Sequence, residues 1–114
     1  MRYSGPVRMT VTTAQVLAAL LADPAADRYG LELIQATGLA SGTLYPILHR
    51  LQEAGWVTAL WEDIDPAEAG RPARRFYRLT PDGVEQARDA LAELHRRTAV
   101  PTTKNASGTV RPAW

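Results

Sequence analysis

Cysteine is absent from this chain of 114 residues, and histidine occurs only twice. Without cysteine, the protein has neither a disulfide framework nor a thiolate metal site. No apolar run approaches the ~20 residues of a membrane-spanning helix. The N-terminus also lacks the basic segment and apolar core of a signal peptide. We therefore expect a cytoplasmic protein with one domain and one modest hydrophobic core.

Patterns that support catalysis are also missing. The sequence has no nucleophile–base pair, no glycine-rich phosphate loop and no cluster of metal ligands, and its two histidines, His49 and His95, lie far apart in sequence. The segment "DIDPAE" has spaced carboxylates but lacks the glycine and the length of a calcium loop. We expect no enzymatic activity, no metal and no other cofactor.

The net charge of +1 says little about a partner, but the charges are separated along the chain. Between Trp56 and Thr80 all the acids precede all the basic residues: Glu62, Asp63, Asp65 and Glu68, then Arg71, Arg74, Arg75 and Arg78. A small domain with this order of charges presents separate acidic and basic surfaces.

The first half of the chain predicts two short helices. Residues 1–11 are irregular, although "VRMTV" is compatible with a short strand. A helix capped by Thr12 or Thr13 extends to about residue 22. A second helix, roughly 28–37, is capped by Asp27, buries Leu31 and Ile34, and ends at Gly38.

The stretch "SGTLYPILHRLQEAGW" predicts a third helix that ends near Gly55. Its apolar residues recur with the spacing of a helix that has one buried face: Leu44, Ile47, Leu48 and Leu51. Pro46 lies among them, although proline costs roughly 3 kcal/mol in a helix interior. Its ring points away from the apolar face, and a cap at Ser41 or Thr43 places it in the first or second turn, where few amide hydrogens are lost.

The second half predicts a hairpin and a last helix. "WVTALWE" forms one strand, residues 56–62, and "ARRFYRL" forms its partner, with Tyr77 and Leu79 on one face and Phe76 and Arg78 on the other. Thr80 caps the last helix and Pro81 occupies its first position. The remainder is polar and rich in small residues, which predicts a flexible tail.

This order of elements defines an α+β winged helix-turn-helix with a two-stranded wing and a C-terminal helix. The alternative is a generic small α+β domain. We divide the chain into an N-terminal extension (1–11), a winged helix-turn-helix DNA-binding domain (12–80), a dimerisation helix (81–98) and a tail (99–114).

The exposed side of the third helix is suited to DNA because its side chains are short or donate hydrogen bonds. Gly42 and Pro46 leave a thin face that can approach a phosphate or a base edge closely. The candidate DNA-binding residues of this helix are Ser41, Gly42, Thr43, Tyr45, Pro46, His49 and Arg50. The hairpin adds Arg71, Arg74 and Arg75. Each residue taken singly also fits an ordinary solvated surface, whereas the set favours DNA.

Two segments, "YGLELIQATGLASGTLYPILHRLQEAGWV" and "GRPARRFYRLTPDG", make the chain resemble the PadR family of transcriptional regulators over about residues 12–95. The resemblance implies a dimeric winged helix-turn-helix repressor that reads a palindromic operator with its third helix and contacts the backbone with its wing. It also implies a C-terminal dimerisation helix. The chain differs from longer members of the family because only one helix follows the wing.

The last helix carries an apolar stripe with coiled-coil spacing: Val84, Ala87, Leu91 and Leu94. A stripe of two heptads is too short to pair alone in water. It therefore packs on its own domain, on a second copy of the chain, or on both.

Two further functions compete with a DNA-binding repressor or add to it. A winged-helix module that binds another protein fits the near-neutral charge and the acidic loop. Control by an unidentified small molecule follows from the resemblance, with Trp56 and Trp61 lining a pocket, although tryptophans on a strand are more often part of a core. The sequence names neither the operator nor the signal.

Overall fold

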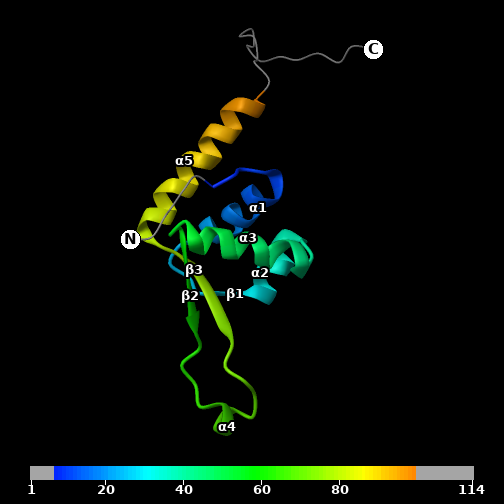
Figure 1. Cartoon of the computed structure of the whole chain (residues 1–114), viewed down its shortest axis with the longest axis vertical. Coiled ribbons are helices and arrows are strands. Elements are labelled where there is room, and N and C mark those ends of the chain that lie inside the picture. The colour runs from blue at the N-terminus through cyan, green and yellow to red at the C-terminus, as the bar shows by residue number, and fades with distance from the viewer. Residues whose placement is uncertain (1–6, 100–114) are drawn as a thin grey trace, which may run out of the picture.

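A computed structural model describes residues 7–99 of the chain. Its elements, in chain order, are α1 (Val11–Leu21), β1 (Arg28–Tyr29), α2 (Gly30–Thr37), α3 (Ser41–Glu53), β2 (Val57–Trp61), α4 (Pro66–Ala69), β3 (Arg75–Leu79) and α5 (Pro81–Thr98). Helices α1, α2 and α3 form a central body, from which the β2–β3 hairpin extends in one direction and α5 in the other (Figure 1). This arrangement confirms the predicted α+β winged helix-turn-helix.

Helix α1 begins earlier than predicted because Thr10 caps it. The Thr10 hydroxyl accepts a hydrogen bond from the Thr13 amide at 3.1 Å and donates one to the Thr13 hydroxyl at 3.0 Å. Thr13 is therefore a buried helical residue and not the cap. The predicted strand "VRMTV" is wrong, since residues 7–10 form neither helix nor strand and Val11 starts the helix. Residues 1–6 of the expected N-terminal extension lie outside the described part.

The sheet has a third strand that the sequence did not predict. Residues 28 and 29 form β1 and pair antiparallel with Tyr77 and Phe76 of β3, so the strand order is β1-β3-β2. The predicted helix start at residue 28 is therefore wrong. Asp27 does not cap α2 either, because its Oδ1 accepts from Arg78 Nε at 3.2 Å. A strand of two residues is too short to leave a periodic signal in the sequence.

Because α2 starts at Gly30, its buried face differs from the predicted one. Leu33 is fully buried and Ile34 packs partly against the core, whereas Leu31 is 63% exposed. The predicted burial of Leu31 is wrong, while that of Ile34 is confirmed in part. Gly38 ends the helix as predicted, with a φ of 74° and its amide bonded to the Ile34 carbonyl.

Helix α3 supplies the centre of the core. Its four apolar residues, Leu44, Ile47, Leu48 and Leu51, are all at most 2% exposed. They pack with Val16, Leu17 and Leu20 of α1 and with Leu33, Val57, Tyr77 and Leu79. Neither Ser41 nor Thr43 caps the helix, because the N-cap is Ala40 and both residues lie within the first turn.

The β2–β3 hairpin and α5 meet at one junction. Val57 pairs with Leu79, and Tyr77 and Leu79, which were predicted to share one face of the strand, are both buried. Thr80 caps α5 by accepting from the Gly83 amide at 2.8 Å, and its hydroxyl donates to the Gly55 carbonyl at 2.8 Å. Gly83 lies so close to the Trp56 carbonyl that a Cβ at residue 83 would overlap it.

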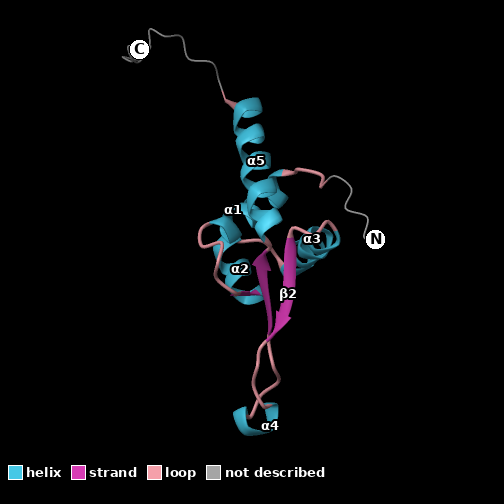
Figure 2. Cartoon of the chain, turned by 90° about the vertical axis from the view of Figure 1, so that its left-hand side faces the viewer, coloured by secondary structure: helices cyan, strands magenta, loops and turns pink. Residues whose placement is uncertain are grey.

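The long tip of the hairpin contains the short helix α4, which was predicted only as a loop. Asp65 caps this helix by accepting from the Ala67 amide at 3.0 Å. Gly70 ends it with a φ of 71°. Figure 2 shows α4 at the far end of the hairpin, well away from the helical body.

We expect Gly83→Ala to lower the free energy of unfolding by roughly 1–3 kcal/mol, because its Cβ would meet a backbone carbonyl that cannot move freely. Gly42→Ala is the matched control, since a Cβ there has no atom within 4 Å. That control should gain about 0.5–1 kcal/mol from helix propensity. Urea titration measures both variants, and equal changes in the same direction would contradict the close packing at Gly83.

Candidate nucleic-acid interface

The predicted DNA-facing residues of α3 all lie on the exposed side of the helix. Ser41, Gly42, Thr43, Tyr45, Pro46, His49 and Arg50 are exposed, and the apolar residues between them are buried. A side chain at Gly42 would point into open space. The outer face of α3 is therefore thin near its start, as the sequence predicted.

Pro46 is the sixth residue of α3 and so lies in the second turn. The amide that it lacks would have bonded the Gly42 carbonyl, four residues back. Gly42 is exposed, so this carbonyl belongs to a residue on the open side of the helix. The N-cap Ala40 provides no side-chain hydrogen bond to the first amides of α3.

Tyr45 connects three elements at the edge of this face. Its side chain lies against Gly30 at the start of α2, where a Cβ would overlap the Tyr45 hydroxyl. Its ring centroid lies 6.4 Å from that of Tyr77 on β3. Because Tyr45 is still 41% exposed, it is positioned by packing and remains accessible.

The three predicted wing arginines have different environments. Arg71 forms a bidentate ion pair with Glu62, with N–O distances of 2.7 and 3.0 Å. The Arg74 guanidinium lies 5.2 Å from the centre of the Tyr29 ring, and that of Arg75 lies 5.4 Å from the Trp61 ring. Arg74 and Arg75 are therefore held over aromatic rings with no carboxylate partner among residues 7–99, whereas Arg71 is already neutralised within the wing.

Glu62 is the centre of a small polar network at the wing. Besides Arg71, its carboxylate accepts from the Tyr29 hydroxyl at 3.1 Å and from the Arg74 amide at 3.2 Å. The Arg71 guanidinium, with further help from the Arg74 amide and Tyr29, lowers the pKa of Glu62 from 4.5 to about 2, although partial burial opposes the change. Glu62 is thus a fixed anion that braces the hairpin against β1.

Two of the other acids of the loop lie at its tip. Asp65 caps α4 and Glu68 lies within it, far along the hairpin from α3 (Figure 2). These two acids are therefore separated from Arg74, whose guanidinium lies over Tyr29 of β1.

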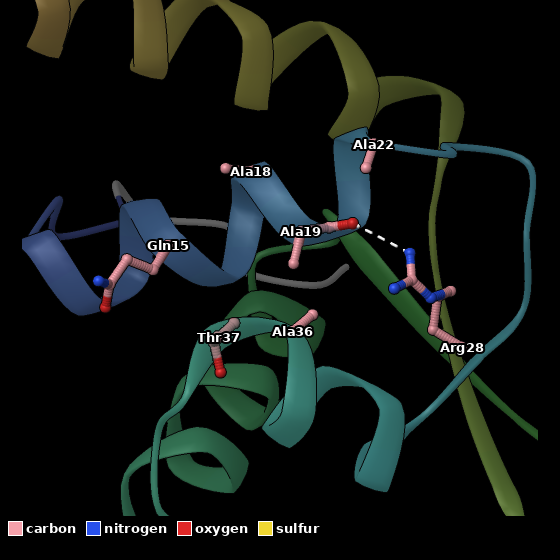
Figure 3. Close-up of a pocket in the computed structure, with 7 residues that line it drawn as sticks. All are labelled: Gln15, Ala18, Ala19, Ala22, Arg28, Ala36 and Thr37. Atoms are coloured by element: carbon pink, nitrogen blue, oxygen red, sulfur yellow. Dashed lines mark hydrogen bonds between the residues drawn. The ribbon is translucent and has the colours of Figure 1, made fainter.

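The two tryptophans have different environments, and neither lines the hollows described below. Trp61 is 66% exposed under Arg75, so it is not a core residue either, and Trp56 packs partly against the core. A hollow of about 440 Å³ does lie between α1, α2 and β1. It is lined mainly by alanines, and Arg28 closes one side by donating to the Ala19 carbonyl at 3.1 Å (Figure 3).

The apolar stripe of α5 is partly covered by its own domain. Ala87 is fully buried, and Val84 and Leu91 pack partly against the core. Helix α5 passes α1 and then continues beyond the body (Figure 1). Leu94 is half-buried and lies in this projecting part. The residues of the tail from 100 onward lie outside the described part.

Sequence reasoning missed several residues that position the interface. Tyr29, Glu62 and Tyr77 hold the wing and Tyr45 in place, and Gly30 admits the Tyr45 ring. For Tyr77 the sequence indicated only that it shares one face of its strand with Leu79, and not which face is buried. No described helix is long and apolar enough to cross a membrane.

The fold and the exposed third helix define a winged helix-turn-helix protein. Residues 16–89 match the family model described as "Transcriptional regulator PadR-like family". Because this match spans more than half of the sequence, the chain belongs to the PadR-like family of transcriptional regulators. The resemblance drawn from the sequence is thereby confirmed.

One curated relative is the transcriptional regulator Rv3488 of Mycobacterium tuberculosis (strain ATCC 25618 / H37Rv), which is 44% identical over 61 residues. The match covers 51% of this chain and 52% of that protein, so the chain spans about half the length of this relative.

Two solved structures share the fold. The protein smu.1704 from Streptococcus mutans UA159 has a TM-score of 0.63 at 22% identity, with 97% of this chain and 100% of that chain covered. The PcaV transcriptional regulator from Streptomyces coelicolor, solved in complex with its natural ligand, has a TM-score of 0.58 at 24% identity. That match covers 87% of this chain and 67% of that chain.

The Glu62–Arg71 pair predicts a pH-dependent stability. Because the folded-state pKa of Glu62, about 2, lies below its usual value of 4.5, its contribution is fully present above pH ~4.5 and is lost as the pH falls towards 2. Glu62→Gln should therefore lower the melting temperature at pH 6 and have progressively less effect between pH 4.5 and 2.

Thermal unfolding followed by circular dichroism measures this effect. Glu68→Gln is the control, because Glu68 lies on α4 with no hydrogen bond or ion pair to the described residues. A difference between wild type and Glu62→Gln that stays constant from pH 6 to pH 2 would show that the pair does not brace the wing.

Proposed function

We propose that this PadR-like regulator is a DNA-binding repressor that acts as a homodimer on a palindromic operator in the cytoplasm. The α3 helix enters the major groove, and the wing contacts the phosphate backbone. The observation that carries this proposal is the α3 face itself, in which every predicted contact residue is exposed and every apolar residue between them is buried.

The charge distribution supports the same orientation. Arg50 on α3 and Arg74 and Arg75 at the base of the hairpin have no carboxylate partner within residues 7–99, so their charge is available to phosphates. Arg71 is a weaker candidate than the sequence indicated, because Glu62 already neutralises it. The acids around α4 project beyond this region and do not oppose a duplex held against α3.

For a two-fold symmetric dimer, the centres of the half-sites lie about 10 bp, or a multiple of this, apart. Helix α5 supplies the pairing surface, because its later part projects from the body with Leu94 incompletely covered. Ala87 serves its own core and is a poor candidate for the seam, which shifts the proposed contact towards Leu91 and Leu94.

We also propose an unidentified small-molecule effector. The support is the shared fold with PcaV, whose structure contains its natural ligand.

Gly42→Arg tests the close approach of α3. The added arginine should strengthen non-specific binding through its charge, yet weaken binding to the specific site at least tenfold, because the long side chain holds the helix away from the groove. Fluorescence anisotropy with operator and unrelated duplexes at two salt concentrations measures both affinities.

The matched control is Glu85→Gln, which raises the net charge by the same amount on exposed α5 without changing α3. Full specific affinity in Gly42→Arg would contradict the close approach of this face. If the wild type bound a protein partner but bound no DNA at any salt concentration, the repressor hypothesis would be wrong and the protein-interaction hypothesis would be supported.

Leu94→Glu tests the dimer. A carboxylate in the proposed seam should give folded monomers at tens of micromolar, because Leu94 lies beyond most of the domain's own core. Light scattering gives the mass, and circular dichroism checks the fold. Ala92→Glu, on the opposite side of the helix, adds the same charge and should leave the dimer intact. A monomeric wild type at this concentration would overturn the proposed assembly.

A further inference from the structure

A second hollow, of about 240 Å³, lies beside α3 where three elements meet. Its walls are residues 29–31 at the start of α2, Tyr45 on α3, and Arg74, Arg75 and Tyr77 on or beside β3. Its lining combines three tyrosines with two arginines. It connects the exposed face of α3 with the base of the wing, so it lies within the surface that we assign to DNA.

Tyr77 presents a hydrogen-bond donor here that the protein does not use. The residue is only 6% exposed, and its hydroxyl makes no hydrogen bond to the described residues. No fully buried side-chain nitrogen or oxygen in that part of the chain lacks a partner, so the hydroxyl must reach solvent, and it does so where Tyr77 lines the hollow. Buried polar groups are normally hydrogen-bonded. A Tyr77 hydroxyl that lines the hollow and has no partner among the described residues therefore indicates a ligand that accepts a hydrogen bond.

The hydroxyl of Tyr77 also keeps its proton. Burial raises the pKa of Tyr77, while the positive charge of Arg75 acts in the opposite direction. The side chain is therefore a neutral donor at physiological pH. Arg75 lies two residues before Tyr77 on β3, so the two side chains share one face of the strand, and both line the hollow.

The remaining walls favour an anion. The Tyr29 hydroxyl donates to Glu62. Gly30 and Leu31, at the start of α2, line the hollow, so the positive end of this helix dipole lies at its wall. Glu32 is the acid closest in sequence, and its carboxylate is held by the Tyr29 amide at 2.8 Å. Gly30 has no Cβ, and this lets the Tyr45 hydroxyl reach the same place.

We propose that this hollow seats one phosphate of the DNA backbone, with the Tyr77 and Tyr45 hydroxyls donating hydrogen bonds to its oxygens and Arg75 supplying positive charge. This inference rests on the proposed DNA binding. It extends the interface from α3 and the wing to the junction between them, and it gives Tyr77 a binding role besides its place in the core.

The first test is Tyr77→Phe, which removes only the hydroxyl and keeps the buried ring. We expect operator affinity to fall roughly tenfold, as for a lost hydrogen bond to a charged group. The melting temperature and the salt slope should not change, because the hydroxyl has no protein partner and carries no charge. Arg75→Gln should instead lower the log–log salt slope by about 0.9. Its control is Arg78→Gln, since Arg78 pairs with Asp27 away from the hollow.

The second test locates the phosphate. Single methylphosphonate substitutions, which make one phosphate neutral, are placed along the operator and measured with wild type and Tyr77→Phe. At one phosphate per half-site, we expect the loss of affinity from the methylphosphonate and the loss from Tyr77→Phe to be non-additive, because both remove the same contact. At every other phosphate the two losses should add. Additive losses at every phosphate, with normal binding by the wild type, would overturn the phosphate seat while leaving the DNA-binding function intact.

A titration with inorganic phosphate at constant ionic strength separates a free anion from the DNA backbone. One combined outcome would show that the hollow binds a free oxyanion and not DNA. In that outcome, free phosphate changes the intrinsic tyrosine signal of the wild type but not of Tyr77→Phe, and the affinity losses from methylphosphonates and from Tyr77→Phe are additive at every phosphate. The inference would then be wrong. A wild type that binds no DNA would remove the proposed function itself, and this inference with it.

Discussion

The carbonyl groups of Gly55 and Trp56 fix the relative positions of α3, the β2–β3 hairpin and α5. Thr80 contacts both, since its hydroxyl donates to Gly55 at 2.8 Å and its amide donates to Trp56 at 2.9 Å. The same hydroxyl caps α5 through the Gly83 amide. Gly83 then lies directly against the Trp56 carbonyl. One threonine and one glycine thus join the end of α3 to the start of β2 and the start of α5, so these elements cannot move independently.

A second constraint acts further along the hairpin. Two strands alone form a weak ribbon, but β1 adds a third strand, and Tyr29 stacks on Phe76 with a centroid distance of 4.3 Å. Glu62 then ties Tyr29, Arg71 and the Arg74 backbone together. The wing is therefore anchored at its base to α2, through the residues that immediately precede that helix. The wing, for which we propose a contact with the DNA backbone, is in this way positioned relative to α3.

This bracing also explains how a chain with a net charge near zero can present a basic surface. Glu62 forms an internal ion pair with Arg71, and Asp65 and Glu68 lie on or cap α4 at the tip of the hairpin. Arg74 and Arg75 rest on aromatic rings, which hold a guanidinium without neutralising it. The surface beside α3 is consequently basic even though the sequence as a whole is not.

The sequence by itself determined the helical body, the hairpin and the exposed face of α3. Four apolar residues at helical spacing specify which side of α3 is buried, so the opposite side, with Gly42 and Pro46, is exposed in any fold that keeps the helix. Strand alternation likewise placed Tyr77 and Leu79 on one face of their strand, and Thr80-Pro81 marked the start of α5. These are local patterns, and each is contained within a few turns or one strand.

The tertiary structure decided what depends on pairing between distant segments. Nothing local marks Arg28 and Tyr29 as a strand, because two residues have no period and their partner lies almost fifty positions away. The same pairing started α2 at Gly30, exposed Leu31 and left the Tyr77 hydroxyl, which lines the hollow, without a hydrogen-bond partner among the described residues. The pairing of Arg71 with Glu62, and the burial of Ala87 by its own domain, also depend on contacts across the fold, since a sequence shows the charge or the stripe but not what lies opposite.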